Sequence, residues 1–337
     1  MDALDVKAAA YTSGEIDEAI LSASENVESL CRRSFAPVLA TRSWPYPNVA
    51  QNEAWTLWLD GSELISLTSL VSGNGTVIPA SGYYLEPNQY GPPYNRIEIN
   101  RGSSYAFSGG PSGPQRSISV TGLFGYNNDE KDEGALAASV SSTSATTITV
   151  AKNIGVGRLL RIDSERMFVT EKDFIDSGQT VQTPLTANLN NNTLVVTNGA
   201  AFTKRESLLI DAERVLIVDI AGNNLIIKRA QQGSTLAAHT ASAIYYARQL
   251  TVTRGVLGTT AATHSNGASV VRYKPPALVE QLTVAYALIR HLGERSGFAR
   301  EAGSGIGAQG SSARYNITDM ENDVQSAHGR QARQRAV

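Results

Sequence analysis

The strongest constraint on the fold of this 337-residue chain is an internal repeat whose two halves recur at different offsets. The first half-motif, IDSERM at 162–167, returns as IDAERV at 210–215. The second half-motif, LIIKRAQQGSTLAAH at 225–239, returns as LTVTRGVLGTTAATH at 250–264. The order along the chain is therefore first, first, second, second, whereas a tandem duplication gives first, second, first, second.

Nesting is the simplest explanation of this order. One complete module, 184–246, would lie inside another whose halves are 138–183 and 247–273. Loss of one half and duplication of the other is the alternative. Nesting lets each module keep both halves of a small β-barrel or sandwich and bury one face by itself. We therefore expect two all-β modules and expect that excising 184–246 leaves a folded protein.

Two amphipathic helices are predicted outside the repeat region. Near the N-terminus, Thr12 and Glu15 have capping-box spacing and Pro37 prevents continuation. The apolar stripe of this helix is formed by Ile16, Ala19, Ile20, Ala23, Val27 and Leu30. A second helix is predicted over 276–297, where a proline pair suits the start and apolar residues recur at spacings of 4, 3, 4 and 3. Its stripe is formed by Leu278, Leu282, Ala285, Ile289 and Leu292.

Between the first helix and the repeats, the pattern changes to strands and turns. Alternating segments bounded by Gly, Pro and Asn predict an antiparallel meander, with an extended stretch at 44–47 and strands at 55–61, 64–71, 83–86, 96–100 and 117–126. One helix cannot cover a whole sheet, so we assign the meander (1–137) and the long late helix (274–300) to one discontinuous domain. The fold class is α+β, with nested all-β insertion modules and an extended C-terminal linker and tail over 301–337.

The composition excludes several classes of protein. Charged residues are 18% of the chain, against about 25% in typical domains, and the formal net charge is −2. This balance does not suggest wrapping of duplex DNA or binding to an anionic membrane. A lone cysteine, Cys31, excludes an intrachain disulfide framework and a multi-cysteine zinc site, and four dispersed histidines leave little for a metal cluster. No apolar run reaches the length of a membrane span, and the first residues lack signal-peptide features, so we expect a reducing, cytoplasmic folding environment.

The repeated half-motifs are the most enzyme-like features. Two carboxylates in Asp-x-Glu lie on the same face of a strand and could support acid–base chemistry or bind a cation. Strand-like apolar residues follow both copies, however, so we favour a structural role. In the second half-motif, Gly233 and Gly258 suit a positive φ and the Thr and His can close a compact loop, which favours loop architecture over a duplicated active site.

Other catalytic patterns are weak. The G-x-G-x-x-G spelling at 305–310 falls in a glycine-rich linker, no Gly-x-Ser-x-Gly occurs in a strand–turn–helix setting, and no phosphate-binding loop is found. Cys31 is expected to be a small core residue. We therefore expect a non-enzyme with no catalytic residues, no metal and no cofactor.

The C-terminal segment 313–337 combines apolar residues with late arginines. It fits a disordered solubilising end, or a segment that becomes ordered on a partner with an acidic patch. The candidate contacts are Arg314, Tyr315, Ile317, Met320, Arg330, Arg333 and Arg335.

This arrangement resembles the head-to-tail connector (adaptor) proteins of tailed bacteriophages. The resemblance is carried by segment 11–37, by the aromatic strand before LDGSELISLTSLV at 59–71, and by the late helix at 277–292 with the tail behind it. It covers residues 1–126 and the last 65 residues. The inserted β region at 138–273 departs from the compact family, which leaves the role of the insert open.

The resemblance implies a virion protein of the neck, synthesised in the host cytoplasm and not associated with a membrane. It implies a homo-oligomeric ring of twelve subunits that docks under the portal protein, extends the DNA channel and presents a platform for the tail or next neck protein. Genomic DNA would pass through without sequence-specific binding. Because the C-terminal segment of the family reaches into the portal, the seven candidate contacts above become portal contacts.

A receptor-binding or carbohydrate-binding tail protein is the rival, because exposed aromatic rings stack on sugars. Its candidate residues are Trp44, Trp55, Trp58 and the tyrosine-rich loop 83–94. A ring of many subunits would favour the adaptor, and glycan binding by a three-fold particle would favour the rival. An enzyme such as a lysin ranks third.

Overall fold

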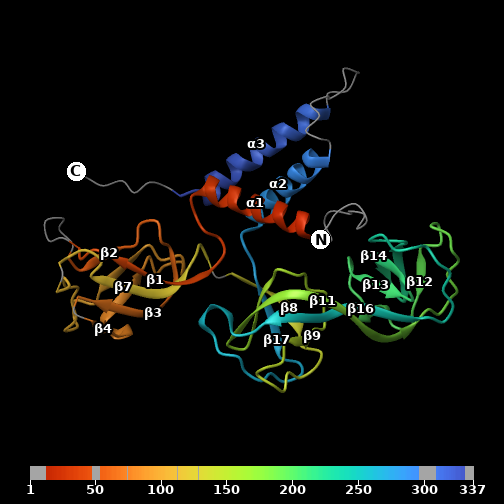
Figure 1. Cartoon of the computed structure of the whole chain (residues 1–337), viewed down its shortest axis with the longest axis horizontal. Helices are drawn as coiled ribbons and strands as arrows, with labels where there is room; N and C mark the ends of the chain where they lie inside the picture. The colour runs from red at the N-terminus through yellow and green to blue at the C-terminus, as the bar shows by residue number, and fades with distance from the viewer. Residues whose placement is uncertain are drawn as a thin grey trace. The chain divides into compact units, whose positions relative to one another are not determined.

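The computed structural model of the chain describes residues 13–47, 54–73, 75–111, 113–127, 129–295 and 309–330. The protein is a mixture of helices and strands that is rich in strands, and its several antiparallel sheets are open in the described residues. The chain divides into two compact units (Figure 1). Unit 1 contains Met1–Glu18 and Glu130–Tyr273, and unit 2 contains Ala19–Asp129 and Lys274–Val337.

The β part of unit 2 consists of two small antiparallel sheets. The first has the order β1-β7-β3-β4, formed by Val38–Trp44, Ile118–Phe124, Leu64–Ser72 and Thr76–Ile78. The second has the order β2-β6-β5, formed by Thr56–Trp58, Arg96–Ile99 and Tyr83–Glu86. The short 3₁₀ helix η3 (Ala80–Gly82) precedes β5. These strands confirm the predicted segments 55–61, 64–71, 83–86, 96–100 and 117–126 to within a few residues.

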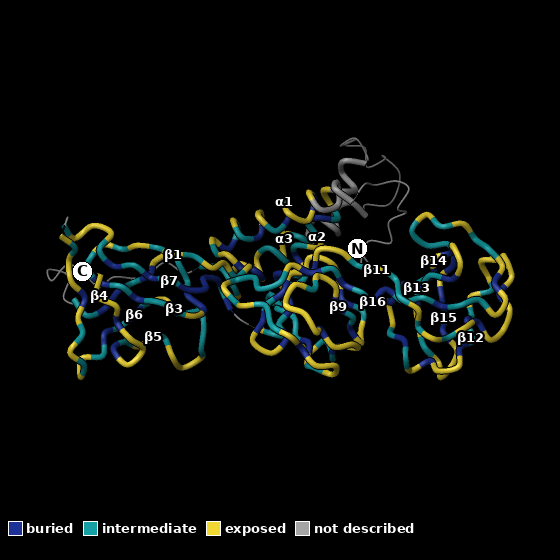
Figure 2. Tube along the Cα trace, turned by 60° about the horizontal axis from the view of Figure 1, so that its bottom comes forward, coloured by how far each residue is buried: buried dark blue, intermediate teal, exposed yellow. Residues whose placement is uncertain are grey.

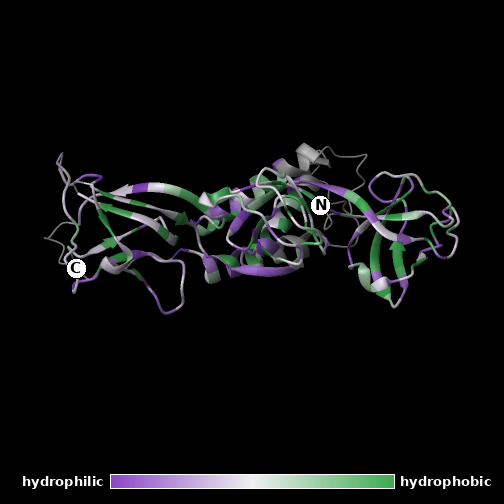
Figure 3. Cartoon of the chain, turned by 90° about the horizontal axis from the view of Figure 1, so that it is seen from below, coloured by the Kyte–Doolittle hydropathy of each residue, from purple (hydrophilic) through white to green (hydrophobic). Residues whose placement is uncertain are grey.

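Alternation of apolar and polar residues builds the core between these strands. Leu64, Leu70, Ile97 and Ile118 are fully buried in one cluster. The close pairing of β7 with β3 depends on Gly122, because a Cβ there would lie 2.3 Å from the carbonyl oxygen of Ser66. Figure 3 shows apolar and polar residues alternating along the strands. The meander is therefore held by a single apolar interior.

Unit 2 also contains most of the helix α1 (Ser13–Cys31) and the helices α2 (Ala277–Arg295) and α3 (Gln309–His328). They share one core, formed by Val27, Cys31, Phe35, Val279, Leu282 and Val324, with Leu30, Tyr126, Tyr286 and Met320 packed against it. The two predicted helices are confirmed. In α1 the predicted stripe is buried at Ala19, Ala23 and Val27 and exposed at Ile20. In α2 the buried face is rotated from the predicted stripe: Leu278 and Ile289 are exposed, whereas Val279 and Ala287 are buried, because α2 packs into a core shared with α1 and α3.

The prediction of an extended C-terminal tail is wrong for Gln309–His328, which forms α3. Ile317, Met320 and Val324 are spaced by three and four residues and therefore lie along one face of that helix. Met320 and Val324 pack into the core shared with α1 and α2. Tertiary packing thus stabilises a helix that carries few apolar residues.

Unit 1 is built around a single ten-stranded antiparallel sheet. The strand order is β12-β15-β14-β13-β16-β11-β10-β17-β8, and β9 pairs with β16. The strands are β8 (Glu130–Ala135), β9 (Thr147–Thr149), β10 (Leu159–Ile162), β11 (Glu165–Thr180), β12 (Thr193–Val195), β13 (Ser207–Ile210), β14 (Glu213–Ala221), β15 (Asn224–Lys228), β16 (Ala243–Thr253) and β17 (Ser269–Tyr273). Two short 3₁₀ helices, η4 (Gly199–Ala201) and η5 (Val256–Gly258), lie in the loops. The strand β8 belongs to this sheet, although the sequence placed it with the meander.

The sheet contains two separate hydrophobic cores. The first includes Leu160, Met167 and Leu250 and is drawn from positions 136–169 and 250–270. The second includes Leu208 and Val215 and is drawn from positions 181–244. Figure 2 marks the buried residues of both. The long strands β11 and β16 run from one core to the other, with irregular register between Val169/Glu171, Asp173/Ile175 and Asp176/Gln179. The boundaries of the two modules stay a prediction.

Candidate functional site

Two fully buried glutamates, Glu165 and Glu213, occupy equivalent positions in unit 1. Each is the first residue of a strand, and each lies two residues after an aspartate in a tight hairpin turn. The aspartates, Asp163 and Asp211, both have φ of 52°, a left-handed conformation that Asp tolerates better than most residues. The Asp-x-Glu pattern is therefore a turn residue followed by a core residue.

The buried carboxylate of Glu213 collects hydrogen bonds from the second half-motif. Nε and Nη2 of Arg229 each donate to it at 2.8 Å, and two backbone amides donate at 2.9 and 3.0 Å. Nε2 of His239 lies 2.9 Å from the same carboxylate, and its Nδ1 lies 2.7 Å from Oδ2 of Asp211. One carboxylate thus fixes the loop that carries both the arginine and the histidine.

The network around Glu165 repeats this arrangement almost atom for atom. Nε and Nη2 of Arg254 donate at 2.6 and 2.7 Å, and two backbone amides donate at 3.1 and 2.9 Å. Nε2 of His264 lies 2.8 Å from Glu165, and its Nδ1 lies 2.7 Å from Asp163. Each first half-motif therefore contacts the second half-motif that the nested order assigns to it.

The charge states of these networks follow from their hydrogen bonds. Burial raises the pKa of Glu165 and of Glu213, but the hydrogen bonds from arginine, histidine and backbone amides outweigh it and lower both to about 2. Hydrogen bonds from His239 and Ser242 lower the pKa of Asp211. Both ring nitrogens of His239 and of His264 face carboxylate oxygens, which accept hydrogen bonds and do not donate them.

This arrangement can hold loops but has little capacity for chemistry. The glutamates are inaccessible, and their lone pairs are already used by several donors. No group of three or more metal-ligating side chains occurs among the described residues. The geometry supports the structural interpretation of both half-motifs.

A third buried ion pair was missed by the sequence analysis. Nε and Nη2 of Arg248 donate to Glu206 at 2.6 and 2.8 Å, and Nη1 of Arg248 donates to the carbonyl of Ala151 at 2.6 Å. Ala151 lies near the first core of unit 1 and Glu206 near the second, so Arg248 joins the two. The available signal was an arginine that directly follows the run AIYYA at 243–247.

The C-terminal helix carries most of the candidate partner contacts. Arg314, Tyr315 and Ile317 lie in α3, and Ile317 is partly exposed. Met320 is partly buried and packs against the helical core. Arg330 follows α3, and its backbone amide donates to the carbonyl of Cys31 at 3.0 Å. Arg333 and Arg335 lie outside the described residues.

Side chains at the end of α3 are fixed by aromatic and polar contacts. Nδ1 of His328 lies 3.2 Å from the hydroxyl of Tyr126, and its ring makes edge contacts with Tyr126 and Phe35. Burial, together with the nearby charge of Arg33, lowers the pKa of His328. No sequence pattern indicates this contact, because it joins residues 202 positions apart.

The three tryptophans of the rival hypothesis lie in the meander. Trp44 stacks on Phe124 with ring centroids 6.3 Å apart. Trp55 and Trp58 lie under the guanidinium groups of Arg101 and Arg96. All three are partly buried, so core packing accounts for much of their surface. Tyr84 and Tyr90 are the aromatic residues of the tyrosine-rich loop that are well exposed.

None of the described helices is long and apolar enough to cross a membrane. Comparisons with protein-family models, with curated proteins and with solved structures found no match to this chain.

Proposed function

We propose that this chain is a structural head-to-tail adaptor of a tailed bacteriophage. In this role, identical subunits form a ring that docks on the portal, extends the DNA channel and offers a platform for the tail. The observation that carries the proposal is the order of elements in unit 2, where an N-terminal helix, an antiparallel meander and late helices form one body around a shared helical core. That order is the one the resemblance was based on, and it is interrupted once, by unit 1.

The proposed portal contacts lie at the C-terminal end of the chain. Met320 stabilises α3 against its own bundle, so its role there is indirect. The arginines among the remaining candidates are proposed to face acidic groups of the portal. The proposed direct contacts are Arg314, Tyr315 and Ile317 on α3, and Arg330, Arg333 and Arg335 after it. Unit 1, with its buried and internally paired charges, is proposed to face neighbouring subunits or other parts of the particle.

The oligomeric state tests the first half of the proposal. Negative-stain images of the purified chain, alone and with portal rings, should contain rings of many subunits. A monomer that stays monomeric beside assembled portal rings would contradict the proposal. A three-fold particle that binds glycans would favour a receptor-binding protein instead.

Portal attachment tests the second half. Deleting α3 would expose the helical core, so substitution is preferable to truncation. The triple variant R330A/R333A/R335A should fold normally but fail to join heads to tails. The matched control is R101A/R116A, which removes two arginines from the meander. DNA-filled, tailed particles assembled with the triple variant would refute the assigned contacts.

A further inference from the structure

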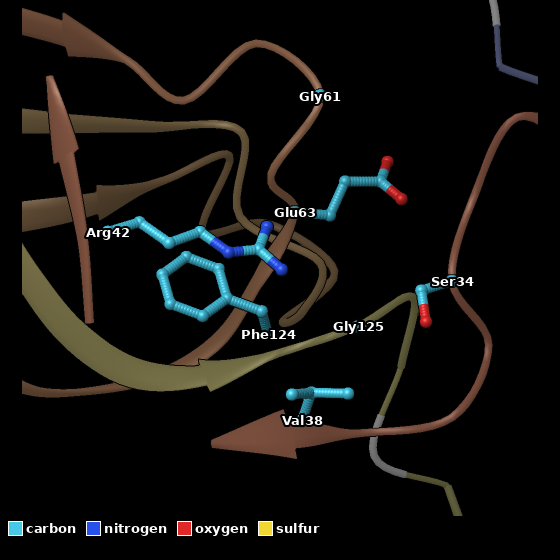
Figure 4. Close-up of a pocket in the computed structure, with 7 residues that line it drawn as sticks. All are labelled: Ser34, Val38, Arg42, Gly61, Glu63, Phe124 and Gly125. Atoms are coloured by element: carbon cyan, nitrogen blue, oxygen red, sulfur yellow. The ribbon is translucent and has the colours of Figure 1, made fainter. Parts of the chain in front are cut away.

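A small notch lies in unit 2 where the segment after α1, the start of β1, the β2–β3 loop and the end of β7 meet (Figure 4). Its volume is about 30 Å³. A water molecule occupies about 10–15 Å³ on this measure, so the notch admits a head group of a few heavy atoms but not a ring. It is lined by Ser34, Val38, Arg42, Gly61, Glu63, Phe124 and Gly125.

Three guanidinium groups reach the notch or its lining from distant parts of the chain. Arg42 lies in β1, and its guanidinium lies over the ring of Phe124, 4.4 Å from the centroid, as Figure 4 shows. Arg33 follows α1, and its Nη2 lies 3.4 Å from Oε1 of Glu63. Arg330 follows α3, and its guanidinium lies against the β2–β3 loop. Positive charge is therefore concentrated around a space of limited size.

The donors of these arginines are incompletely used. Within the described part of the chain, the guanidinium groups of Arg42 and Arg330 make no hydrogen bond. Nε of Arg33 is buried and has no partner there. Buried donors without acceptors are rare in folded proteins and call for a specific explanation. An acceptor that enters the notch would meet the unused donors of Arg42, which lines it.

The charge balance indicates what kind of acceptor fits. Glu63 lines the notch, and Glu28 lies beside it, since it accepts a hydrogen bond at 3.2 Å from Ser34, which lines the notch. Three guanidinium groups against two carboxylates leave an excess of positive charge that a single negative charge balances. A guanidinium presents its N–H groups as a planar fork, which matches the two oxygens of a carboxylate. A tetrahedral phosphate dianion is larger and carries twice the charge.

We propose that this notch binds the carboxylate of an Asp or Glu side chain on a partner polypeptide, with Arg42 as the principal bidentate donor. Arg33 and Arg330 add charge from the sides, while Phe124 keeps Arg42 in place. Because Arg330 is positioned by α3, the complete site exists only when the C-terminal helix is packed on its bundle. This inference goes beyond the adaptor proposal and depends only on the geometry of unit 2.

Calorimetric titration of the full chain tests the assignment. The probes are a short Glu-containing peptide, the same peptide with Gln in place of Glu, and inorganic phosphate. The Glu peptide should bind and the Gln peptide should not. R42A should weaken binding about tenfold or more, and R42K should recover part of it, since the charge returns without the planar fork. E63Q should tighten binding several-fold, because it removes a competing negative charge.

The matched control is R116A, which removes an exposed arginine elsewhere in the meander and should leave binding unchanged. Unfolding midpoints of all variants establish that they are folded, and the opposite signs expected for R42A and E63Q separate a binding effect from a general loss of structure. The proposal would be overturned if the Glu peptide did not bind, or if the Glu and Gln peptides bound equally. It would also be overturned if folded R42A bound the Glu peptide as the unchanged chain does, or if phosphate bound more tightly than the Glu peptide.

Discussion

The hydroxyl of Tyr286 in α2 donates a hydrogen bond to Oε1 of Glu321 in α3 over 2.7 Å. Burial and the neighbouring carboxylate raise the pKa of Tyr286, so the hydroxyl stays protonated and able to donate over the whole physiological range. The bond ties the last described helix to the one before it, beside the shared apolar core.

Replacing Tyr286 by Phe should loosen α3 without unfolding the meander. Loss of a hydrogen bond to a charged acceptor costs about 1.5–3 kcal/mol. Faster amide hydrogen exchange confined to α3 is the expected result. The control is Y84F, which removes a hydroxyl from a tyrosine that is 53% exposed. Unchanged exchange in α3 would mean that apolar contacts alone hold the helix.

Replacing Glu213 by Gln should strongly destabilise unit 1. The variant leaves the buried guanidinium of Arg229 and the ring of His239 without their shared carboxylate, which costs about 3–5 kcal/mol. E165Q should have a similar effect, because its network is equivalent. D219N is the control, since Asp219 pairs with Lys204 at the surface. Denaturant unfolding followed by far-UV circular dichroism measures all three, and an E213Q variant as stable as D219N would contradict the prediction.

Acid should destabilise unit 1 in a defined pH window. The pKa of Glu165 and Glu213 is lowered from 4.5 to about 2 in the folded state, so the unfolded chain binds more protons between these values. The stability that the two groups contribute is therefore complete above about pH 4.5 and is lost as the pH falls toward 2, by roughly 3 kcal/mol for each. The measurement is the change of the unfolding free energy with pH between pH 6 and pH 2.5. This change should be smaller in E165Q, and an unchanged pH dependence in E165Q would contradict the role given to Glu165.

Mild acid should weaken the attachment of α3. The pKa of His328 is lowered in the folded state by burial and by Arg33, so packing favours the neutral ring. Stability from this packing is present above the ordinary histidine pKa of about 6.5 and is lost as the pH falls through the lowered value. Hydrogen exchange of α3 should therefore rise between pH 7.5 and pH 5 relative to the intrinsic exchange rate. The variant H328F keeps the ring contacts with Tyr126 and Phe35 and should remove this pH dependence.

Removal of the inner module should leave a folded chain. Asp173 and Gln249 face each other on β11 and β16, so replacing 174–248 by an Asn-Gly turn closes a hairpin at an existing pair. The deletion removes Arg248 together with its partner Glu206, so no buried arginine is left without its carboxylate. Cooperative thermal unfolding of the deletion variant is the expected outcome. A broad, non-cooperative transition would show that the two cores of unit 1 depend on each other.

The sequence predicted elements whose burial is decided locally. The strand 83–86 and the helix that ends at Cys31 were found because alternation and helical spacing reflect which side of an element is buried. The buried face of α2 was predicted less well than that of α1, since Val279 rather than Leu278 enters the core that α2 shares with two other helices. The helix α3 was missed because its few apolar residues are diluted by polar ones.

The networks of unit 1 were predicted in part. The recurrence of the half-motifs identified Glu165, Glu213, His239 and His264 as residues of interest and favoured a structural role. Their mutual contacts could not be derived, because each joins a turn in one hairpin to a loop much further along the chain. The notch could not be predicted from the sequence for the same reason, since only the fold brings Arg42 and Arg330 to the same region.

The helical core of unit 2 is completed late in synthesis. Val27 and Cys31 leave the ribosome early, but Val324, which covers the same core, is made after the meander and all of unit 1. At about 5–20 residues per second, the apolar face of α1 waits roughly 15–60 s for its last partner. During that time the nascent chain exposes the apolar face of α1. The shared core is complete only after α3 has been made, so chains that are truncated before α3 cannot complete it.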